Sequence, residues 1–247
     1  MTDKKTTVSE HLIELRSRLI KSIIFLIITF IICYIFSEKI YNFLVDPYAQ
    51  AVKDDGNNRR LIFTALHETF LTYLKLAFFS AFFFSCPLIL IQIWKFIAPG
   101  LYKDEKLALF PFLVATPILF LLGGMLVYYL IMPIAIKFFL SFESVSINGS
   151  LPIQLEAKVN EYLSLVMRLI LAFGISFQLP VFLTLLAKVG FITSEYLKTR
   201  RKYVVIIIFS MAALLTPPDP ITQIGLALPL LLLYEISIYT VKMVEKK

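Results

Sequence analysis

Long apolar blocks with few charges recur along this 247-residue chain and restrict its possible folds more than any other feature. Hydrocarbon about 30 Å thick is spanned by a helix of about 20 apolar residues. Four blocks are long enough to span it: residues 19–36, 70–94, 107–131 and 162–187. Hydrophobic residues form 59% of the chain and charged residues 17%, which would leave a soluble fold with excessive apolar surface. The sequence therefore predicts an all-α integral membrane protein.

The C-terminal region is interpreted as two short transmembrane helices, residues 203–215 and 221–241, joined by a tight turn. The alternative is one long span kinked at the run Thr216-Pro217-Pro218-Asp219-Pro220. Prolines lack backbone donors and disfavour helix in the preceding residue, and an aspartate is costly within hydrocarbon. Two spans fit better, and they predict six transmembrane helices in a single polytopic domain of residues 1–247.

The distribution of basic residues predicts the orientation. With six spans, most of the 24 Lys and Arg residues fall in segments on the side of the N-terminus. Cytoplasmic loops carry an excess of Lys and Arg, so both termini are expected in the cytoplasm. The net charge of +7 is explained in this way. Nucleic acid is not an expected partner, because its binding requires basic residues on a water-facing surface.

Polar residues within the apolar blocks are candidates for function, because the bilayer penalises them. Lys75 and Arg168 are expected to snorkel or to form structural ion pairs, with a functional role as the alternative. Gln178 precedes Pro180 by two residues. It is expected either to satisfy backbone freed by the proline or to line a polar cavity. Gly123-Gly124 is interpreted as a close contact between helices.

An acidic patch is expected on the cytoplasmic face. Residues 11–19 predict an amphipathic segment entering the first span, with Glu14 and Arg18 at the i, i+4 spacing of a helical ion pair. Glu105 lies in the loop after the second block. Two carboxylates there would suit an arginine-bearing ligand, since guanidinium binds carboxylate bidentately. The sequence contains no catalytic, metal-binding or phosphate-loop motif, so neither an enzyme nor a cofactor is expected.

Four stretches together resemble the TatC family, the polytopic receptor subunit of the twin-arginine protein export system. They are HLIELRSRL from His11, WKFIAPGLYKDEK from Trp94, FGISFQLPV from Phe173 and LLTPPDPITQ from Leu214. The resemblance covers nearly the whole chain, to about Glu235. It implies six helices with both ends in the cytoplasm, in agreement with the charge distribution.

The resemblance also implies a site for a ligand. Glu14 and Glu105 would bind the twin-arginine signal peptide of folded cargo, with Arg16 and Phe96 in the surrounding cytoplasmic surface. Where Gln178 stands, the family commonly has Glu, so a titrating role at this position is not expected here.

Partner positions follow from the same resemblance. Thr216 and Gln223 match positions near which the single-span partners TatA and TatB dock. Pro47 and Asp219 match positions that are important in the family. The resemblance further implies a multimeric complex in the cell membrane, or in the inner membrane of a bacterially derived organelle.

The leading interpretation is therefore a non-enzymatic receptor of the twin-arginine translocase, with export driven by the proton gradient. The alternative is a small-molecule secondary transporter. That class usually shows internal repeats, and no motif of this sequence occurs twice. A structural membrane scaffold is the third possibility.

Overall fold

The structure is a computed structural model that describes residues 8–53, 60–97, 106–143, 153–216 and 219–245. Within these ranges the chain is helical apart from connecting segments and an isolated parallel bridge between Ile62 and Lys158. The helical segments are α1 (Val8–Ile35), α2 (Ser37–Lys53), α3 (Glu68–Ile97), α4 (Lys106–Leu126), the π-helical η3 (Val127–Ile131), α5 (Met132–Leu140), α6 (Val159–Ser176), α7 (Leu179–Lys188), α8 (Ser194–Leu215) and α9 (Pro220–Glu245).

Five segments of the described chain are long and apolar enough to cross a membrane. They are Leu12–Ile35, Glu68–Ile93, Pro111–Leu140, Val159–Lys188 and Pro220–Glu245. The expectation of an all-helical membrane protein is confirmed, and each segment contains most of one predicted apolar block. α8 is not among the five, because its first part, residues 194–202, carries several charged side chains.

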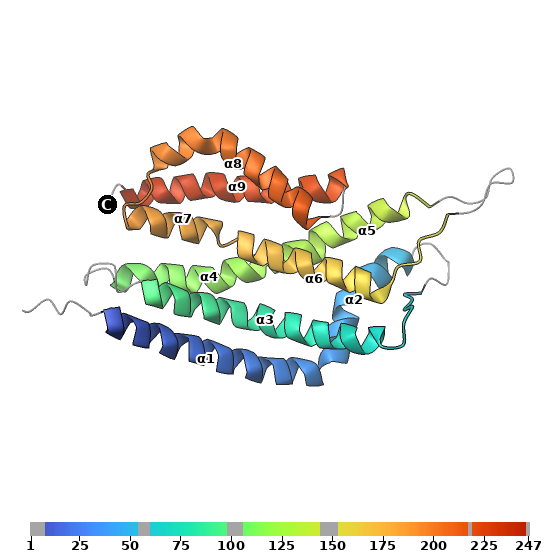
Figure 1. Cartoon of the computed structure of the whole chain (residues 1–247). Helices are drawn as coiled ribbons and strands as arrows, with labels where there is room; N and C mark the ends of the chain where they lie inside the picture. The colour runs from blue at the N-terminus through green and yellow to red at the C-terminus, as the bar shows by residue number, and fades with distance from the viewer. Residues whose placement is uncertain (1–7, 54–59, 98–105, 144–152, 217–218, 246–247) are drawn as a thin grey trace, which may run out of the picture.

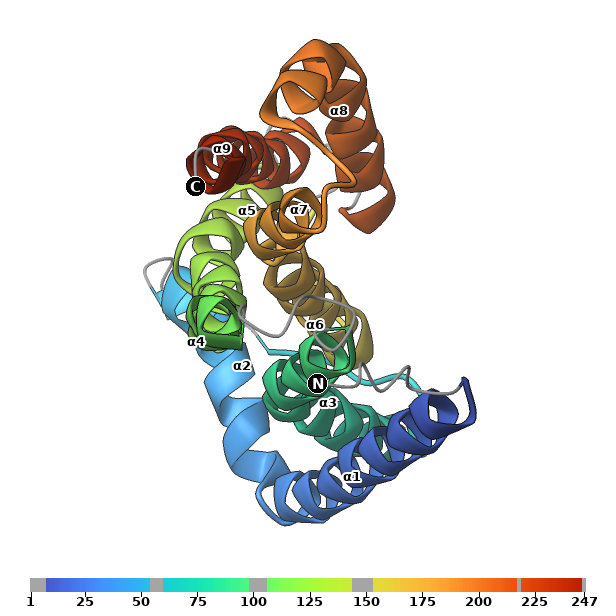
Figure 2. The same cartoon turned by 90° about the vertical axis from the view of Figure 1, so that its left-hand side faces the viewer.

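The long helices run side by side along one direction, and the described N- and C-terminal ends lie at the same end of the bundle (Figure 1). Viewed along this direction, the helices follow a curve (Figure 2). α1 and α3 occupy one end of the curve, α4 and α6 the middle, and α8 and α9 the other end. The bundle is therefore an open arc rather than a closed ring of helices.

α8 and α9 form an antiparallel hairpin rather than one kinked helix (Figure 1). α8 ends at Leu215, because Thr216 adopts an extended backbone with φ −93° and ψ 158°. Arg201 on α8 contacts Glu235 on α9, with 2.6 Å between Nη2 and Oε2. The structure therefore has two helices here rather than one kinked helix, and the crossing of the membrane by both stays a prediction.

Both of these helices are longer than the short fifth and sixth helices that the sequence predicted. α8 has 22 residues and α9 has 26, against expected segments of residues 203–215 and 221–241. α8 begins with the polar residues 194–202, and the Thr193 hydroxyl caps it by accepting a hydrogen bond from the Tyr196 N–H at 3.2 Å. An apolar block marks only the part of a helix that lies in hydrocarbon, so the capped polar turns were missed.

The third and fourth spans are interrupted helices. The third continues past its predicted end at residue 131, through η3 into α5, because residues 132–140 are also largely apolar. The fourth breaks at Phe177 and Gln178, between α6 and α7. Pro180 cannot donate to the carbonyl of Ser176, which is where the helical hydrogen-bond ladder stops.

α4 and α6 pack closely through glycine. A Cβ at Gly123 would lie 2.7 Å from the Phe173 carbonyl oxygen, and one at Gly174 would lie 2.8 Å from the Phe120 ring. The interpretation of Gly123-Gly124 as a close helix contact is therefore confirmed. This contact fixes α6 in the middle of the arc.

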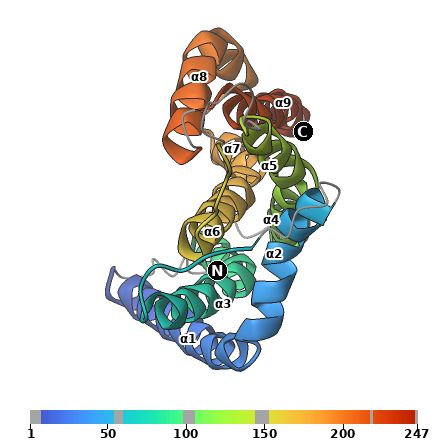
Figure 3. The same cartoon turned by 90° about the vertical axis from the view of Figure 1, so that its right-hand side faces the viewer.

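The sequence analysis did not predict α2. This helix leads from the end of α1 past α3 toward α5, across the direction of the long helices (Figures 1 and 3). Its composition is amphipathic and mixed rather than apolar, so it does not resemble a span. An element that packs on the end of a bundle has no apolar block to reveal it.

Buried Pro47 lies inside α2 and explains how this helix is held. Because proline has no N–H, the carbonyl of Phe43, four residues earlier, loses its helical partner. The Tyr128 hydroxyl in η3 donates to that carbonyl at 2.8 Å. The Tyr162 hydroxyl in α6 donates to the adjacent Leu44 carbonyl at 3.0 Å. Two tyrosines thus tie α2 to the third and fourth spans.

Candidate functional site

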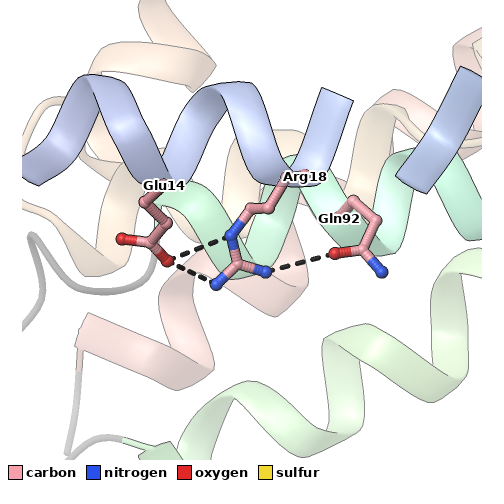
Figure 4. Close-up of polar contacts among 3 residues, drawn as sticks. All are labelled: Glu14, Arg18 and Gln92. Carbon is pink, nitrogen blue, oxygen red and sulfur yellow. Dashed lines mark hydrogen bonds and ion pairs between the residues drawn. The ribbon is translucent and has the colours of Figure 1, made fainter. Parts of the chain in front are cut away.

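The expected ion pair near the N-terminus is present and is joined by a second helix (Figure 4). Arg18 donates to one oxygen of Glu14, from Nε at 3.0 Å and from Nη2 at 2.5 Å. Its remaining terminal nitrogen, Nη1, donates to the Gln92 amide oxygen on α3 at 3.2 Å. The Glu14 side chain is 35% exposed and that of Arg18 is 23% exposed. A guanidinium therefore already lies on this carboxylate, at the surface of the bundle.

The packing of α1 against α3 decides which predicted site residues meet. The two helices are antiparallel (Figure 1), and the bond between Arg18 and Gln92 sets their register. Glu14 is one turn before Arg18 and Phe96 is one turn after Gln92, so Glu14 and Phe96 lie at the same level. Phe96 is half-buried in the last turn of α3.

Two other predicted members of the site, Arg16 and Glu105, are not placed beside Glu14 by the structure. Arg16 is exposed, but it is two residues from Glu14, and helical residues with this spacing do not face each other. The structure therefore does not bring Arg16 and Glu14 together. Glu105 lies outside the described residues.

Sequence reasoning missed Gln92. It lies in the second apolar block, where it is a neutral polar side chain among aliphatic neighbours. That contrast was the available signal, because amides within a span are costly unless they are bonded. Its partner on α1 could not be identified without the register between the two helices.

At the opposite end of the bundle, Asp219 caps α9. One carboxylate oxygen accepts a hydrogen bond from the Thr222 N–H at 2.7 Å, and the other accepts one from the Thr222 hydroxyl. Pro220 occupies the first position of α9, where its missing N–H costs nothing. Asp219 is 6% exposed and Thr222 is 1% exposed. The aspartate that the sequence placed in a turn is thus a buried helix cap.

The two predicted partner-docking residues are also bonded within this hairpin. The Thr216 hydroxyl donates to the Ala212 carbonyl at 2.9 Å, and Thr216 is buried. The Gln223 amide nitrogen donates to the Phe209 carbonyl on α8 at 3.3 Å. Gln223 is half-buried, so it keeps part of its amide at the surface.

Gln178 is buried and bonds across helices. Its amide nitrogen donates to the Thr116 carbonyl on α4 at 2.9 Å. Its amide oxygen has no hydrogen-bond partner within the described ranges. The side chain does not cap α7, so it does not repair the backbone beside it. It links the break in the fourth span to the third span instead.

The two cations within spans differ in their surroundings. Lys75 on α3 donates from Nζ to the Asn160 amide oxygen at 3.0 Å. Arg168 on α6 is exposed and has no hydrogen bond or ion pair with any other residue that the structure describes. Lys75 thus bonds to a neutral amide rather than forming the expected ion pair, and snorkelling of either cation stays a prediction.

These features define a class of protein. The chain is a multi-pass helical membrane protein with a carboxylate–guanidinium site at one end. At the other end, buried polar side chains are hydrogen-bonded within the α8–α9 hairpin. No group of three or more His, Cys, Asp or Glu side chains suited to a metal ion occurs among the described residues.

Comparisons with known proteins identify the family. The model of the Sec-independent protein translocase protein (TatC) family matches residues 10–229. The chain is 48% identical to Sec-independent protein translocase protein TatC of Magnetococcus marinus over 99% of its own length and 87% of the relative. It is 45% identical to the TatC protein of Rickettsia prowazekii, over 96% of its length and 92% of the relative.

A solved structure agrees with these relatives. The crystal structure of the twin-arginine translocase receptor TatC superposes with a TM-score of 0.80 at 38% identity, covering 96% of this chain and all of the other.

The chain belongs to the TatC family. It is a multi-pass membrane component of the Tat translocase for protein export, not an enzyme. The leading interpretation of the sequence is thus confirmed at this level, and the small-molecule transporter is set aside.

Proposed function

We propose that this chain is the receptor that binds the arginine pair of twin-arginine signal peptides, and that Glu14 is the residue that accepts it. Glu105 and Phe96 complete the site, with Arg16 in the surrounding surface. The observation that carries the proposal is the guanidinium of Arg18, which already lies on the Glu14 carboxylate. A signal arginine would present the same chemical group to the same oxygens.

Arg18 then acts as an internal competitor. It donates to one of the two Glu14 oxygens, and an ionised carboxylate can accept about four hydrogen bonds. An incoming guanidinium can bind the second oxygen or displace Arg18 toward Gln92. Because the pair is partly exposed, its contribution to stability is small, roughly 0.2–1 kcal/mol. Such a pair is weak enough to be exchanged.

The proposed topology has six crossings in a single domain of residues 1–247, with both termini in the cytoplasm. α8 supplies the crossing that hydropathy alone does not count, since it lies antiparallel to α9 along its length (Figure 1). Its basic start also fits a cytoplasmic interface. The Arg200 guanidinium stacks on the rings of Tyr196 and Tyr203, as expected where a helix leaves the bilayer.

Recruitment of TatA- and TatB-type single-span helices is proposed at the α8–α9 hairpin. Gln223 is half-buried and is bonded through its nitrogen, so its amide oxygen can accept a hydrogen bond from a partner. Thr216 is buried within the hairpin, where its hydroxyl donates to the Ala212 carbonyl. Assembly into a multimeric complex and export driven by the proton gradient follow from the family.

Binding of a labelled signal peptide to the full chain in lipid nanodiscs tests the receptor site. Glu14→Gln is expected to weaken binding about tenfold or more, because a hydrogen bond to a charged group contributes roughly 1.5–3 kcal/mol. Arg18→Gln is expected to tighten binding, up to about fivefold, because it removes the competitor. The matched control is Glu161→Gln, an exposed carboxylate at the other end of the bundle.

A second peptide sharpens this test. With both signal arginines replaced by lysine, wild-type binding is expected to fall, because lysine cannot bind a carboxylate bidentately. Unchanged binding by Glu14→Gln would refute the assignment of Glu14. Weaker binding by Arg18→Gln would show that Arg18 positions the carboxylate rather than competing for it.

A further inference from the structure

An apolar cavity lies between α2, α3, the third span and α6. Its volume is about 510 Å³, within the range of about 300–1,000 Å³ that ligand sites in proteins occupy. The floor of the cavity is buried and comes from three helices, at Leu44, Phe79 and Ile170. The rim is apolar and exposed, at Phe43 and Met125. Because the surrounding helices cross a membrane, an apolar ligand can enter this cavity from the lipid.

A second, polar cavity continues the first toward the end of the bundle opposite the chain termini. Its volume is about 570 Å³, and it shares Phe43, Tyr128 and Tyr129 with the apolar cavity. Asp46 and Lys137 also line it. α2 and α4 lie on the convex side of the arc, away from the opening between α1 and α8 (Figure 2). Tyrosine is typical of the level where hydrocarbon meets headgroups. The two cavities thus form one site, apolar within the membrane and charged at its surface.

The third span joins the two cavities along its length. Residues at four-residue spacing line one cavity or both: Leu121, Met125, Tyr129, Pro133 and Lys137. In an α-helix this spacing drifts around the axis, and the wider turn of the π-helical η3 offsets part of the drift. From Leu121 to Lys137 the helix rises about 24 Å. One leaflet with its headgroups is half of a bilayer, roughly 20–22 Å. The site therefore has the length of a phospholipid in one leaflet.

The charges of the polar cavity match a headgroup that carries both signs. Lys137 is exposed and has no hydrogen bond or ion pair with another described residue, so its ammonium group can bind a phosphate. Asp46 is half-buried, and the Gln50 amide nitrogen donates to one of its oxygens at 2.6 Å. The other oxygen accepts no hydrogen bond from the described residues. One anion and one cation in the same cavity favour a zwitterion over an anionic headgroup.

We propose that this site binds a phospholipid whose headgroup carries a primary ammonium group, phosphatidylethanolamine, in the leaflet opposite the chain termini. One acyl chain would fill the apolar cavity, the phosphate would contact Lys137, and the ammonium group would donate to Asp46. The lipid would hold α2 against the third span. The site is separate from Glu14 and from the α8–α9 hairpin, so it goes beyond the proposed function.

Native mass spectrometry of the full chain, titrated in detergent with lipids of identical acyl chains, tests the headgroup. Wild type is expected to bind phosphatidylethanolamine about fivefold or more tightly than phosphatidylcholine, whose trimethylammonium group has no N–H to donate. Asp46→Ala should lose this preference. Lys137→Gln should weaken the binding of both lipids about threefold, because both carry the phosphate. The matched control is Glu38→Ala, an exposed carboxylate two turns earlier on α2 that lines neither cavity, and it should keep the preference.

Two further variants test the apolar cavity. Ser80 is buried and lines it, and its hydroxyl has no partner among the described residues, so Ser80→Leu fills space without breaking a hydrogen bond. Met125→Trp enlarges the exposed rim instead. Both should weaken the binding of every lipid about threefold or more, because part of the acyl chain is excluded. Thermal unfolding checks that each variant is folded. Soluble glycerophosphoethanolamine should not displace the lipid, since it leaves the apolar cavity empty.

The opposite results would each overturn the proposal. Equal binding of phosphatidylethanolamine and phosphatidylcholine by wild type, or a preference that survives in Asp46→Ala, would refute the contact between the ammonium group and Asp46. Tighter binding of phosphatidylglycerol would mean that the site selects a net negative charge. Unchanged lipid binding by both Ser80→Leu and Met125→Trp, or displacement by glycerophosphoethanolamine, would show that no acyl chain occupies the cavity.

Discussion

At the scale of single residues, Asp219 shows that a polar group can serve the fold rather than a ligand. Its carboxylate accepts hydrogen bonds from the backbone N–H and the hydroxyl of Thr222, at the start of α9. The first N–H groups of a helix have no partner within it, and inside a membrane water does not supply one. The carboxylate of Asp219 thus has a direct structural role in this chain.

Asp219→Ala is expected to lower the free energy of unfolding by about 1–2 kcal/mol, because the α9 cap is lost. Asp219→Asn keeps an acceptor oxygen and is expected to stay near wild type. Denaturant unfolding in detergent micelles measures both. Equal destabilisation by Asn and Ala would mean that the negative charge, not the cap, is what the hairpin requires.

At the other end of the bundle, Arg18 and Gln92 are the single residues that hold the Glu14 carboxylate. The Glu14 carboxylate is held by a guanidinium that is itself held by an amide of α3. The proposed arginine site therefore already contains an arginine of the chain, and the effect of Arg18→Gln on peptide binding separates competition from positioning.

At the scale of elements, α2 depends on groups from other helices. Pro47 removes the donor that would bond the Phe43 carbonyl, and Tyr128 replaces it. Phe43 also stacks on Tyr128, with ring centroids 4.4 Å apart and planes 2° from parallel. The proline and the tyrosine form one unit, although 81 residues separate them in the sequence.

Tyr128→Phe is expected to destabilise the fold by about 1–3 kcal/mol, because the Phe43 carbonyl is left without a donor. Restoring the N–H with Pro47→Ala should recover part of this loss, so the double variant should be more stable than Tyr128→Phe alone. Thermal unfolding of the four proteins gives the coupling energy. Tyr129→Phe, at an exposed neighbour, is the control. Simple additivity of the two changes would contradict the pairing.

At the scale of the whole molecule, the number of crossings depends on α8. Its apolar part is short, but it lies antiparallel to α9, so in the proposed topology both helices run between the same two membrane surfaces. A neighbour that is tilted or a bilayer that is locally thin accommodates such a helix at modest cost. The hairpin therefore places the end of α9 on the same side as the start of α1 (Figure 1).

Labelling of single cysteines with a membrane-impermeant maleimide in intact cells tests this topology. Cys33 and Cys86 are buried, and Ala replaces both in the background. Cysteine at Thr64 is expected to be labelled, while cysteine at Glu195 or Met243 is expected to be protected. If α8 does not cross, Met243→Cys will be labelled although Glu195→Cys is protected. All three positions are exposed in the structure.

The sequence by itself determined the features that depend on local spacing and local polarity. Apolar length set the membrane class and the approximate spans, prolines set the turn before α9, and i, i+4 spacing set the Glu14–Arg18 pair. These are properties of single segments in a membrane, where every backbone polar group must be hydrogen-bonded within the protein. Each of them can therefore be read from its own segment of the sequence.

Only the tertiary structure decided the features that join distant segments. It paired Arg18 with Gln92, Gln178 with the Thr116 carbonyl, and the tyrosines with α2. It also left one face of α6, with Arg168, uncovered. These depend on helix register and on which faces pack, and lipid is as apolar as the helix surfaces, so hydropathy does not select among possible neighbours. Close contacts and cross-helix hydrogen bonds make that selection.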